Sequence, residues 1–478
     1  MVILSGHTLD AESLHAIAHG APVRLGGEAV ASMRANVQDW EPVDVLSSTV
    51  ERLSGRVGNP QVRDFVLGHC AGVGEDLPTE HVRALMACRA NVLAQGFSGC
   101  RPETAELLVA MLNEGVHPCV PSQGSVGAAG DLAPLAHVAA IALRLAGTAE
   151  RGGQTLSATE AMAGLPEFQP THKESLSLIN GATLVAAQGA LAVHRVRQLL
   201  HTAERALSMT MAVVLSDTTC LSDEVLALRG HKTALQAARR VRALVHGSHL
   251  TNTSRRPDAF SIRCAPAVLG AAWHALEHAE QVIQLELNGA CDNPLLVDGK
   301  LLHGGNFHGA PVAMVLDYLK IALTQVASIS ERRIFRLTYG QLTGNLPSFL
   351  LESSGVNNGF MLAQYTAASL VSECKGLSHP ASVDSIPTGQ HHEDHVSMGP
   401  AAARTLNMVL AAVEHVLAIE VLVAAQGLEF RRAEATLCDP VEESLGRVRA
   451  VVPRWTEDRV LHRDLEAVSA LVRAGQLV

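Results

Sequence analysis

Aromatic residues are scarce in this chain, and long apolar runs are absent. Phe, Trp and Tyr together make up 3% of 478 residues, and the only tyrosines are Tyr318, Tyr339 and Tyr365. No stretch approaches the roughly 20 uninterrupted apolar residues that a membrane-spanning helix needs. The first six residues contain neither a basic segment nor a long apolar run of the kind that targets a chain for export. We therefore expect a soluble protein with no membrane partner.

An excess of positive charge and paired cysteines are also missing. The 37 Lys and Arg residues are outnumbered by 47 Asp and Glu residues, giving a net charge of −10. Nucleic acids and anionic membranes both require basic patches, so neither is an expected partner. Nine cysteines occur without any CxxC pair, which is typical of reduced thiols in a cytoplasm rather than of a disulfide framework. The abundant class is apolar, at 47%, which suits a large core and buried subunit contacts.

The apolar pattern predicts a mainly helical chain. Val62, Phe65, Val66 and His69 recur at the spacing of one helix face. Longer helices are expected over residues 131–147, 184–214, 311–333, 354–378 and 400–427. The last two are apolar nearly all round, which is typical of buried helices. Residues 148–165 are expected to form a polar loop.

One glycine-rich stretch carries the strongest motif. Residues 124–135 read Gly-Ser-Val-Gly-Ala-Ala-Gly-Asp-Leu-Ala-Pro-Leu. This stretch resembles the electrophile-forming motif of the histidine and aromatic amino-acid ammonia-lyases, and further ordered motifs extend the resemblance from about residue 61 to 435. The resemblance implies a mainly α fold, namely a long antiparallel helical bundle of the ammonia-lyase (fumarase/aspartase-like) type with a small mixed N-terminal cap. It also implies a homotetramer.

The resemblance implies a division of the chain into three ranges. Residues 1–60 are expected to form the N-terminal cap and active-site lid region, and residues 61–435 the ammonia-lyase-like helical domain. Residues 436–478 are charged and are expected to form a C-terminal helical hairpin.

Within the motif, one residue departs from the family. Its members cyclise an Ala-Ser-Gly tripeptide, which loses water to give methylidene-imidazolone (MIO), and the MIO methylidene group captures the substrate. The tripeptide here is Ala128-Ala129-Gly130. Alanine has no hydroxyl to eliminate, so we predict that MIO is absent and that the chain carries no cofactor. Ala129 and Gly130 are still expected at the substrate, and the helix that follows offers unpaired N–H groups to an anion.

Other departures concern the family's tyrosines. The resemblance places a catalytic tyrosine loop near residues 39–46, which here read Asp-Trp-Glu-Pro-Val-Asp-Val-Leu, and no tyrosine precedes Tyr318. Phe260 replaces a second pocket tyrosine, and Pro257 replaces a glutamine. An engineered knockout would account for Ala129 and Phe260 but not for the other changes, so we favour natural divergence.

Several binding residues of the family are retained. Arg263 matches the arginine that holds the substrate carboxylate, a role suited to a bidentate guanidinium; the alternative is a purely structural arginine. Asn180, in an Asn-Gly segment, matches the asparagine beside the electrophile. Asn306 and Phe307, in the Gly-Gly-Asn-Phe-His motif, are expected to line the pocket, as is Phe260.

The candidate proton carriers are the titratable residues left at pocket positions. His69 ends a helix-end motif, and the alternative is a histidine that only stabilises the helix C-terminus through the dipole. Glu393 matches an acidic or amide residue near the substrate amine, and His392 precedes it. Histidine is the side chain poised to exchange protons near neutral pH. With Asn180 these residues form the predicted catalytic set.

A metal site is the other interpretation of the histidines in this segment. His391 and His395 are four residues apart and would share a face of a helix, as paired ligands must. Pro387 and Gly389 favour a loop instead, and the Glu-Asp-His run also occurs in metal-free relatives, so we predict no metal.

Two functions remain. The first is an MIO-independent lyase, isomerase or cyclase that acts on an amino-acid-like small molecule held by Arg263 and Asn180. The second is a catalytically inactive paralogue that binds a small molecule or assembles with an active lyase. The joint retention of Arg263 and Glu393 favours the enzyme.

Overall fold

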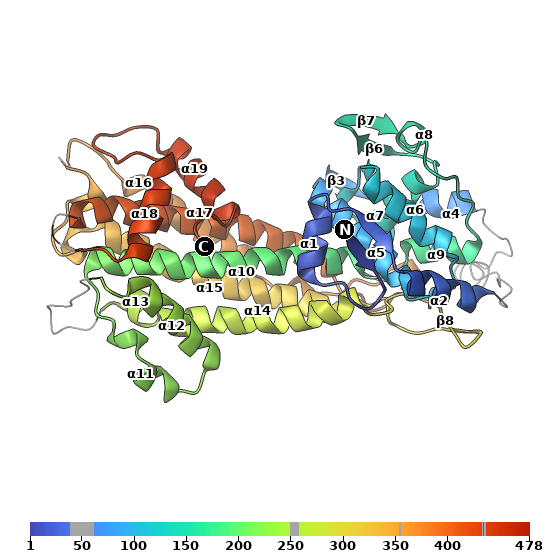
Figure 1. Ribbon diagram of the computed structural model, residues 1–478, viewed down its shortest axis with the longest axis horizontal. Coiled ribbons are helices and arrows are strands. Elements are labelled where there is room, and N and C mark those ends of the chain that lie inside the picture. Colours follow the sequence, from blue (N-terminus) through green and yellow to red (C-terminus); the bar gives the residue numbers. More distant parts are fainter. Residues whose placement is uncertain (39–61, 249–257, 353–354, 433, 435) are drawn as a thin grey trace. The chain divides into compact units, whose positions relative to one another are not determined.

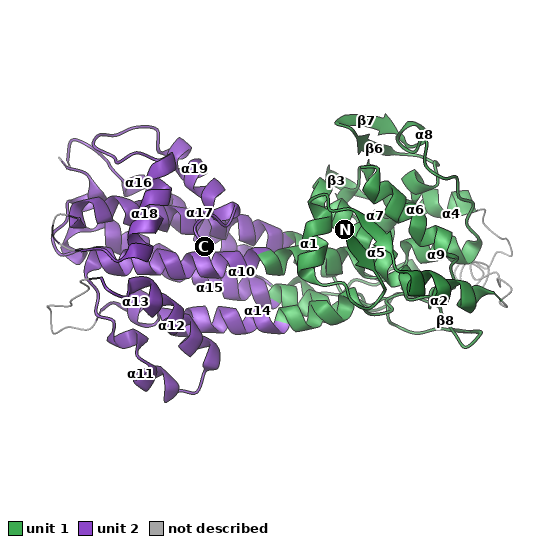
Figure 2. Ribbon diagram, in the orientation of Figure 1, with its two compact units in different colours: residues 1–194, 279–317, 380–404 green, residues 195–278, 318–379, 405–478 purple. Residues whose placement is uncertain are grey.

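The computed structural model describes residues 1–38, 62–248, 258–352, 355–432, 434 and 436–478. The chain divides into two compact units built from discontinuous segments (Figure 2). Unit 1 comprises residues 1–194, 279–317 and 380–404, and unit 2 comprises residues 195–278, 318–379 and 405–478. This division does not test the predicted ranges 1–60, 61–435 and 436–478, which stay predictions, and the replacement loop 39–46 lies outside the described residues.

Unit 1 combines short helices with small sheets (Figure 1). Its helices are α1 (Ala11–Ala18), α2 (Gly27–Val37), α4 (Val62–His69), α5 (Thr79–Ala94), α6 (Pro102–Asn113), α7 (Leu132–Ala142), α8 (Ala158–Ala161), α9 (His172–Ile179) and the 3-10 turns η4 (Ala381–Val383) and η5 (Gly389–His391). Its strands are β1 (Val2–Leu4), β2 (Val23–Leu25), β3 (Val73–Asp76), β4 (His117–Pro118), β5 (Pro121–Gln123), β6 (Thr148–Arg151), β7 (Gln154–Ser157), β8 (Leu295–Val297) and β9 (Lys300–Leu302). The apolar spacing that predicted a helix after Gln61 is confirmed by α4.

The strands pair locally. β1 pairs with β2 in parallel, β3 with β5 and β8 with β9 antiparallel, and β4, β6 and β7 form a three-stranded sheet. The predicted polar loop over 148–165 is therefore wrong. β6 and β7 form a hairpin that turns at Gly152 and Gly153, both at positive φ, and Ser157 then caps α8 in a capping box with Glu160. The strands are short and mostly polar, so they lack the apolar alternation that signals a strand.

Four long helices supply the framework of the chain. They are α10 (Thr183–Val214), α14 (Ala265–Leu287), α15 (Ala310–Thr338) and α17 (Gly399–Arg431). Within unit 2, Glu420 of α17 accepts hydrogen bonds from Thr210 of α10 and from Arg333 of α15. Trp273 of α14 donates to Glu204 of α10 at 2.8 Å. The helices predicted over 184–214, 311–333 and 400–427 are confirmed by α10, α15 and α17, whereas α14 was not predicted. These bonds make the long helices neighbours in the core of unit 2.

The remaining elements of unit 2 are shorter. They are η1 (Thr219–Leu221), α11 (Asp223–Ala227), α12 (Lys232–Val245), α13 (Phe260–Arg263), η2 (Gly340–Leu342), η3 (Ser348–Leu350), α16 (Met361–Leu377), α18 (Asp439–Val451) and α19 (Leu461–Arg473). The two C-terminal helices contact each other, and α12 contacts α18.

Two helices are long and apolar enough, by length and composition alone, to cross a membrane. They are α15 and α17. The most apolar stretch of α17 is 83% buried inside the protein, and that of α15 is 56% buried. Both are apolar core helices, and α15 keeps part of its apolar surface exposed.

The start of α7 positions the glycine-rich motif. Asp131 is its N-cap residue, and Pro134 lies in its first turn. The Asp131 carboxylate does not cap α7. Its Oδ2 accepts the N–H groups of Leu184 (2.8 Å) and Val185 (3.1 Å) in the first turn of α10. One buried carboxylate therefore holds the starts of two helices together.

Candidate active site

The altered tripeptide is held by backbone contacts with the segment that follows α9. The Gly181 N–H donates to the Ala129 carbonyl at 3.2 Å, and the Asp131 N–H donates to the Gly181 carbonyl at 2.9 Å. Gly130 has φ +78°, and a Cβ added to it would lie 2.1 Å from the carbonyl carbon of Gly181. Only glycine fits at position 130. This close approach sets Ala129 beside the Asn180-Gly181 segment.

A cavity of about 560 Å³ opens against this tripeptide in unit 1. Its walls come from the tripeptide, from α4 and α9, and from residues 293–308 and 389–395. Most of the predicted site residues line it: His69, Ala129, Asn180, Phe307, His392 and Glu393. Residues far apart in the sequence are thus brought together on one cavity.

The other predicted site residues do not line this cavity. Gly130 is buried against Gly181, and exposed Asn306 donates from Nδ2 to the Ala290 carbonyl at 3.1 Å. Phe260 and Arg263 belong to α13 in unit 2. Phe260 is 74% exposed, and the Arg263 guanidinium lies 5.8 Å from the centre of its ring. Their roles stay predictions.

His69 is the last residue of α4 and is fixed by its own helix. Its Nδ1 lies 2.7 Å from the carbonyl oxygen of Phe65. A carbonyl oxygen only accepts, so Nδ1 carries a proton, and Nε2 is the ring nitrogen through which His69 can exchange one. The Phe65 ring packs against the imidazole with 4.6 Å between ring centres. The helix therefore presents a proton acceptor on the cavity wall.

Asn180 is the C-cap residue of α9 and is only 4% exposed. Its Oδ1 has no hydrogen-bond partner in the described part of the chain. Leaving a buried polar atom unpaired costs about 1–3 kcal/mol. An N–H or O–H group in the cavity would satisfy this oxygen, so Asn180 is prepared to hold a polar ligand.

Glu393 is positioned by a short bridge within its own loop. The Thr388 hydroxyl donates to Glu393 Oε2 at 2.6 Å, and the Thr388 N–H donates to the Glu393 carbonyl at 3.0 Å. The predicted loop around Gly389 is confirmed, since its only helical element is the single turn η5. His391 does not line the cavity, and among the described residues no three His, Cys, Asp or Glu side chains are arranged to hold a metal ion.

Two histidines that line the cavity were not predicted from the sequence. His303 and His308 line it together with His395. The His308 and His395 rings stack with 5.6 Å between centres, and His308 Nε2 is a buried atom without a partner among the residues the structure describes. The available signal was position, because His308 ends the Gly-Gly-Asn-Phe-His motif that already predicted Phe307.

Buried charges surround the anchor of the tripeptide. Burial raises the pKa of the Asp131 carboxyl to about 7, although the Val185 and Leu184 N–H groups act against it. Burial, with the nearby charge of Asp131, also raises the pKa of Glu286 to about 7. Arg89, which lies against Gly181, pairs with Asp292 at 3.2 Å. These ionisable groups line no part of the cavity, so we assign them to the support of the site.

The known proteins that this chain resembles include ammonia-lyases and aminomutases. The aromatic amino acid lyase family model matches residues 60–450. Histidine ammonia-lyase from Gloeobacter violaceus is 44% identical over 100% of this chain and 96% of its own length, and that from Symbiobacterium thermophilum is 48% identical over 87% and 83%.

Solved structures agree with the sequence comparison. Histidine ammonia-lyase from Trypanosoma cruzi superposes with a TM-score of 0.89 at 37% identity, covering 99% of this chain and 94% of that one. Tyrosine aminomutase from Streptomyces globisporus gives a TM-score of 0.90 at 32% identity, covering 100% and 97%. The predicted mainly helical ammonia-lyase fold is confirmed. This chain belongs to the aromatic amino acid lyase family and is homologous to histidine ammonia-lyase.

Proposed function

We propose that this chain is an MIO-independent lyase, isomerase or cyclase that acts on an amino-acid-like small molecule. The observation that carries the proposal is the buried Oδ1 of Asn180, which has no hydrogen-bond partner among the described residues, on the same cavity as the imidazole of His69 and the methyl side chain of Ala129. We assign Asn180 as the binding group and His69 as the proton acceptor beside Ala129.

The residues do not fit the family cofactor. MIO formation needs a hydroxyl on the central residue of the tripeptide, and Ala129 has none. Ser125 carries the only hydroxyl in residues 124–131, but it lies outside the tripeptide, where its Oγ accepts the Gly127 N–H at 3.1 Å and donates to the Gly130 carbonyl at 3.5 Å. We therefore assign no step of the reaction to MIO.

The chain's own side chains divide the proton transfers. His69 Nε2 takes the proton that leaves carbon, while Asn180 accepts a hydrogen bond from the substrate's amino group. Glu393, with one carboxylate oxygen held by Thr388, faces the cationic part of the substrate. His392 returns a proton to the leaving group or product, since elimination needs both a base and an acid. Without an electrophile, the leaving group must be better than unactivated ammonia.

The proposal also includes the oligomeric state of the protein. We assign Arg263 to the substrate carboxylate, and, because it does not line the cavity of unit 1, we propose that another copy in a homotetramer delivers it. Exposed apolar residues on α15, Met314 and Ile321 among them, supply surface for such contacts. The expected location is the cytoplasm, where the nine cysteines, all free in the structure, stay reduced.

Untargeted mass spectrometry on a native metabolite extract tests the proposal. Wild-type protein should convert one metabolite into another, and the mass difference names the reaction. His69→Ala and Arg263→Ala should abolish the conversion, whereas His462→Ala, which removes an exposed imidazole on α19, should leave it intact. Absence of any conversion by the wild type would favour the inactive paralogue, and release of ammonia from histidine would refute the MIO-independent chemistry.

A further inference from the structure

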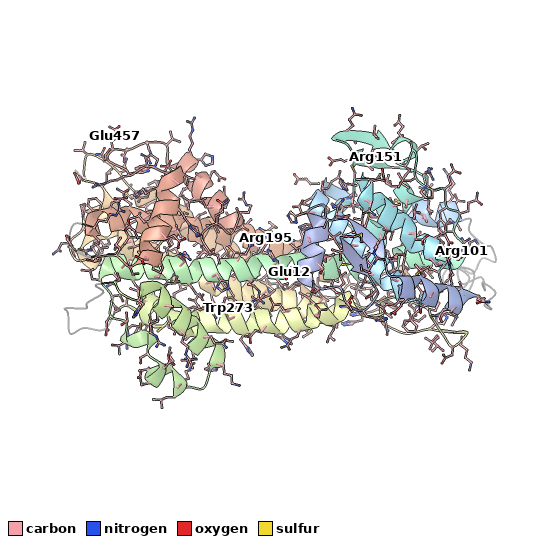
Figure 3. All side chains as sticks on the ribbon, in the orientation of Figure 1. Glu12, Arg101, Arg151, Arg195, Trp273 and Glu457 are labelled. Carbon is pink, nitrogen blue, oxygen red and sulfur yellow. The ribbon has the colours of Figure 1, made fainter. Side chains whose placement is uncertain are left out.

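The one-turn helix α13 carries two of the predicted site residues and is too short to be stable by itself. It leads into α14, which carries the Trp273 labelled in Figure 3. Isolated helices of a few residues are unstable in water, so contacts with the rest of unit 2 must fix this turn. Phe260 and Arg263 are exposed, whereas Ile262 is only 1% exposed. The turn therefore has a buried side that holds it and an outer side that carries both predicted site residues.

A buried arginine holds the middle of α13. Arg333 Nη1 of α15 donates to the Ser261 carbonyl at 3.3 Å. The same guanidinium is paired with Glu420 of α17, and both side chains of that pair are fully buried. Because Arg333 cannot move without breaking the buried pair, its bond to Ser261 fixes the turn against the long helices of unit 2.

Asp258 holds the chain just before the turn. Its Oδ2 accepts the Ser216 hydroxyl at 2.6 Å and the Asp217 N–H at 3.1 Å. Ser216 is fully buried and follows the end of α10 at Val214 by two residues. Hydrogen bonds to an ionised acceptor are about twice as strong as those between neutral groups. One carboxylate thus joins the entry to α13 to the end of α10.

These contacts hold the backbone on both sides of Arg263. Asp258 lies five residues before it, and α14 begins two residues after it with the fully buried Ala265. The backbone at position 263 is therefore fixed relative to the end of α10, and only the side-chain angles of Arg263 remain to be set. A displacement of about 1 Å in a group that orients a substrate can cost about 100-fold in rate, so this placement matters for binding.

We propose that Asp258 is a positioning residue for the reaction: its hydrogen bonds to Ser216 and Asp217 fix α13 so that Arg263 meets the substrate carboxylate. This inference rests on the role proposed above for Arg263. Asp258 touches no substrate and acts only through the turn. The carboxylate contact exists both before and during the reaction, so loss of Asp258 raises KM more than it lowers kcat.

Kinetics on the full-length protein test the inference. A dilution series of the native metabolite extract gives the KM of each variant relative to the wild type, without purification of the substrate. Asp258→Leu removes the acceptor and should raise KM about tenfold or more, with a change in kcat below about threefold. Asp258→Asn keeps an oxygen that accepts from Ser216 and Asp217, so its KM should stay within about threefold of the wild type. Ser216→Ala removes one of the two hydrogen bonds and should give an intermediate KM.

Hydrogen exchange of the amides in residues 260–264 measures the fixation of α13 without any substrate. Exchange should be about tenfold faster or more in Asp258→Leu and unchanged in Asp258→Asn. The matched control is Asp464→Leu, because Asp464 also joins two segments of unit 2 by accepting from Trp455 Nε1 at 2.6 Å and Arg459 Nε at 3.0 Å. The control should leave both the KM and the exchange of residues 260–264 unchanged.

The possible failures are distinct. Unchanged exchange in Asp258→Leu, or faster exchange with an unchanged KM, would overturn the positioning role while the proposed function stands. A lower kcat at constant KM would reduce Asp258 to a structural residue, as would an equal rise of KM in Asp464→Leu. No conversion by the wild type at any dilution of the extract would refute the proposed function, and this inference with it.

Discussion

At the residue scale, one oxygen atom separates the side chain at position 129 from the serine that the family chemistry requires. The hydrogen bonds that anchor the tripeptide, from Gly181 N–H to the Ala129 carbonyl and from Asp131 N–H to the Gly181 carbonyl, involve only main-chain atoms. We therefore expect a serine at position 129 to keep these main-chain contacts. We also expect the side chain at this position to determine whether MIO can form.

Intact-protein mass measures this directly. Wild-type protein should have the mass of its unmodified sequence. Ala129→Ser restores Ala-Ser-Gly, and its mass should be lower than the mass of its own sequence because MIO formation releases water. Ala128→Ser, with serine one position earlier, should have the full mass of its own sequence. A wild-type mass below that of the sequence would contradict the absence of MIO.

Gly130 is the residue whose replacement should cost most stability in the tripeptide. Gly130→Ala adds a Cβ 2.1 Å from Gly181 at φ +78°, so we expect a loss of roughly 3 kcal/mol or more from strain and overpacking. Gly153→Ala is the control, because Gly153 has φ +77° and nothing within 4 Å of its added Cβ. It should cost about 1 kcal/mol. Thermal unfolding compares the two, and equal losses would refute the close contact.

Glu286 should make stability depend on pH. Its folded pKa of about 7 lies above the ordinary 4.5, so the folded state binds the proton more tightly than the unfolded state. The resulting stabilisation is full below pH 4.5 and is lost as the pH rises through about 7. In Glu286→Gln, the fall in unfolding free energy with rising pH should be smaller by up to roughly 3 kcal/mol, at about 1.4 kcal/mol per pKa unit. Urea unfolding at pH 5 and pH 8 should show a smaller difference in the variant than in the wild type.

At the scale of elements, buried charges join the long helices of unit 2. Glu420 on α17 forms a fully buried pair with Arg333 on α15 and also accepts from Thr210 on α10 and Ser330 on α15. One carboxylate thus satisfies donors from two neighbouring helices. Apolar packing alone would tolerate sliding of one helix along another, whereas this network fixes their register.

Removal of that carboxylate should be costly. Glu420→Ala leaves the Arg333 guanidinium buried without its counter-charge, for an expected loss of about 3–5 kcal/mol in unfolding free energy. Glu352→Ala removes the acid of an exposed pair with Arg454 and should cost at most about 1 kcal/mol. If calorimetry finds the two variants equally stable, Glu420 does not hold the long helices in register.

Helices were the predictable part of the fold. The runs that became α10, α15 and α17 are long and strongly apolar, so local pattern was enough to locate them. The β6–β7 hairpin was missed because its strands are short and polar. The Asp131 carboxylate accepts from the first turn of α10 rather than from its own helix, and such a long-range bond leaves no local signal.

The candidate site was predictable only where motifs carried it. His69, Asn180 and Glu393 were found from family motifs, and the structure places them on one cavity. The stacked pair of His308 and His395 depends on two segments that are 87 residues apart in the sequence, and no spacing rule joins them. Which polar atoms lack a partner is likewise a property of the folded chain alone.

At the scale of the whole molecule, α15 carries an apolar stripe that the single chain leaves open. Met314 is 63% exposed and Ile321, seven residues and two turns later, is 44% exposed. The proposed homotetramer would cover this stripe. Ile321→Arg should lower the mass observed by sedimentation velocity, because a charge would be buried at the contact. Val460→Arg, at an exposed position between α18 and α19, should leave the assembly intact. A wild-type protein that sediments as a monomer would refute the proposal.

The main-chain anchoring of residues 128–131 has a consequence for how such a protein changes over time. Main-chain amide groups and one obligatory glycine secure the loop, and neither contact involves the side chain at position 129. A mutation at position 129 can therefore change the reactivity of the site while the main-chain contacts of the loop stay the same. A lineage can exchange the reactive atom without first rebuilding the framework, and the cavity that remains is open to whichever chemistry its histidines and amide can support.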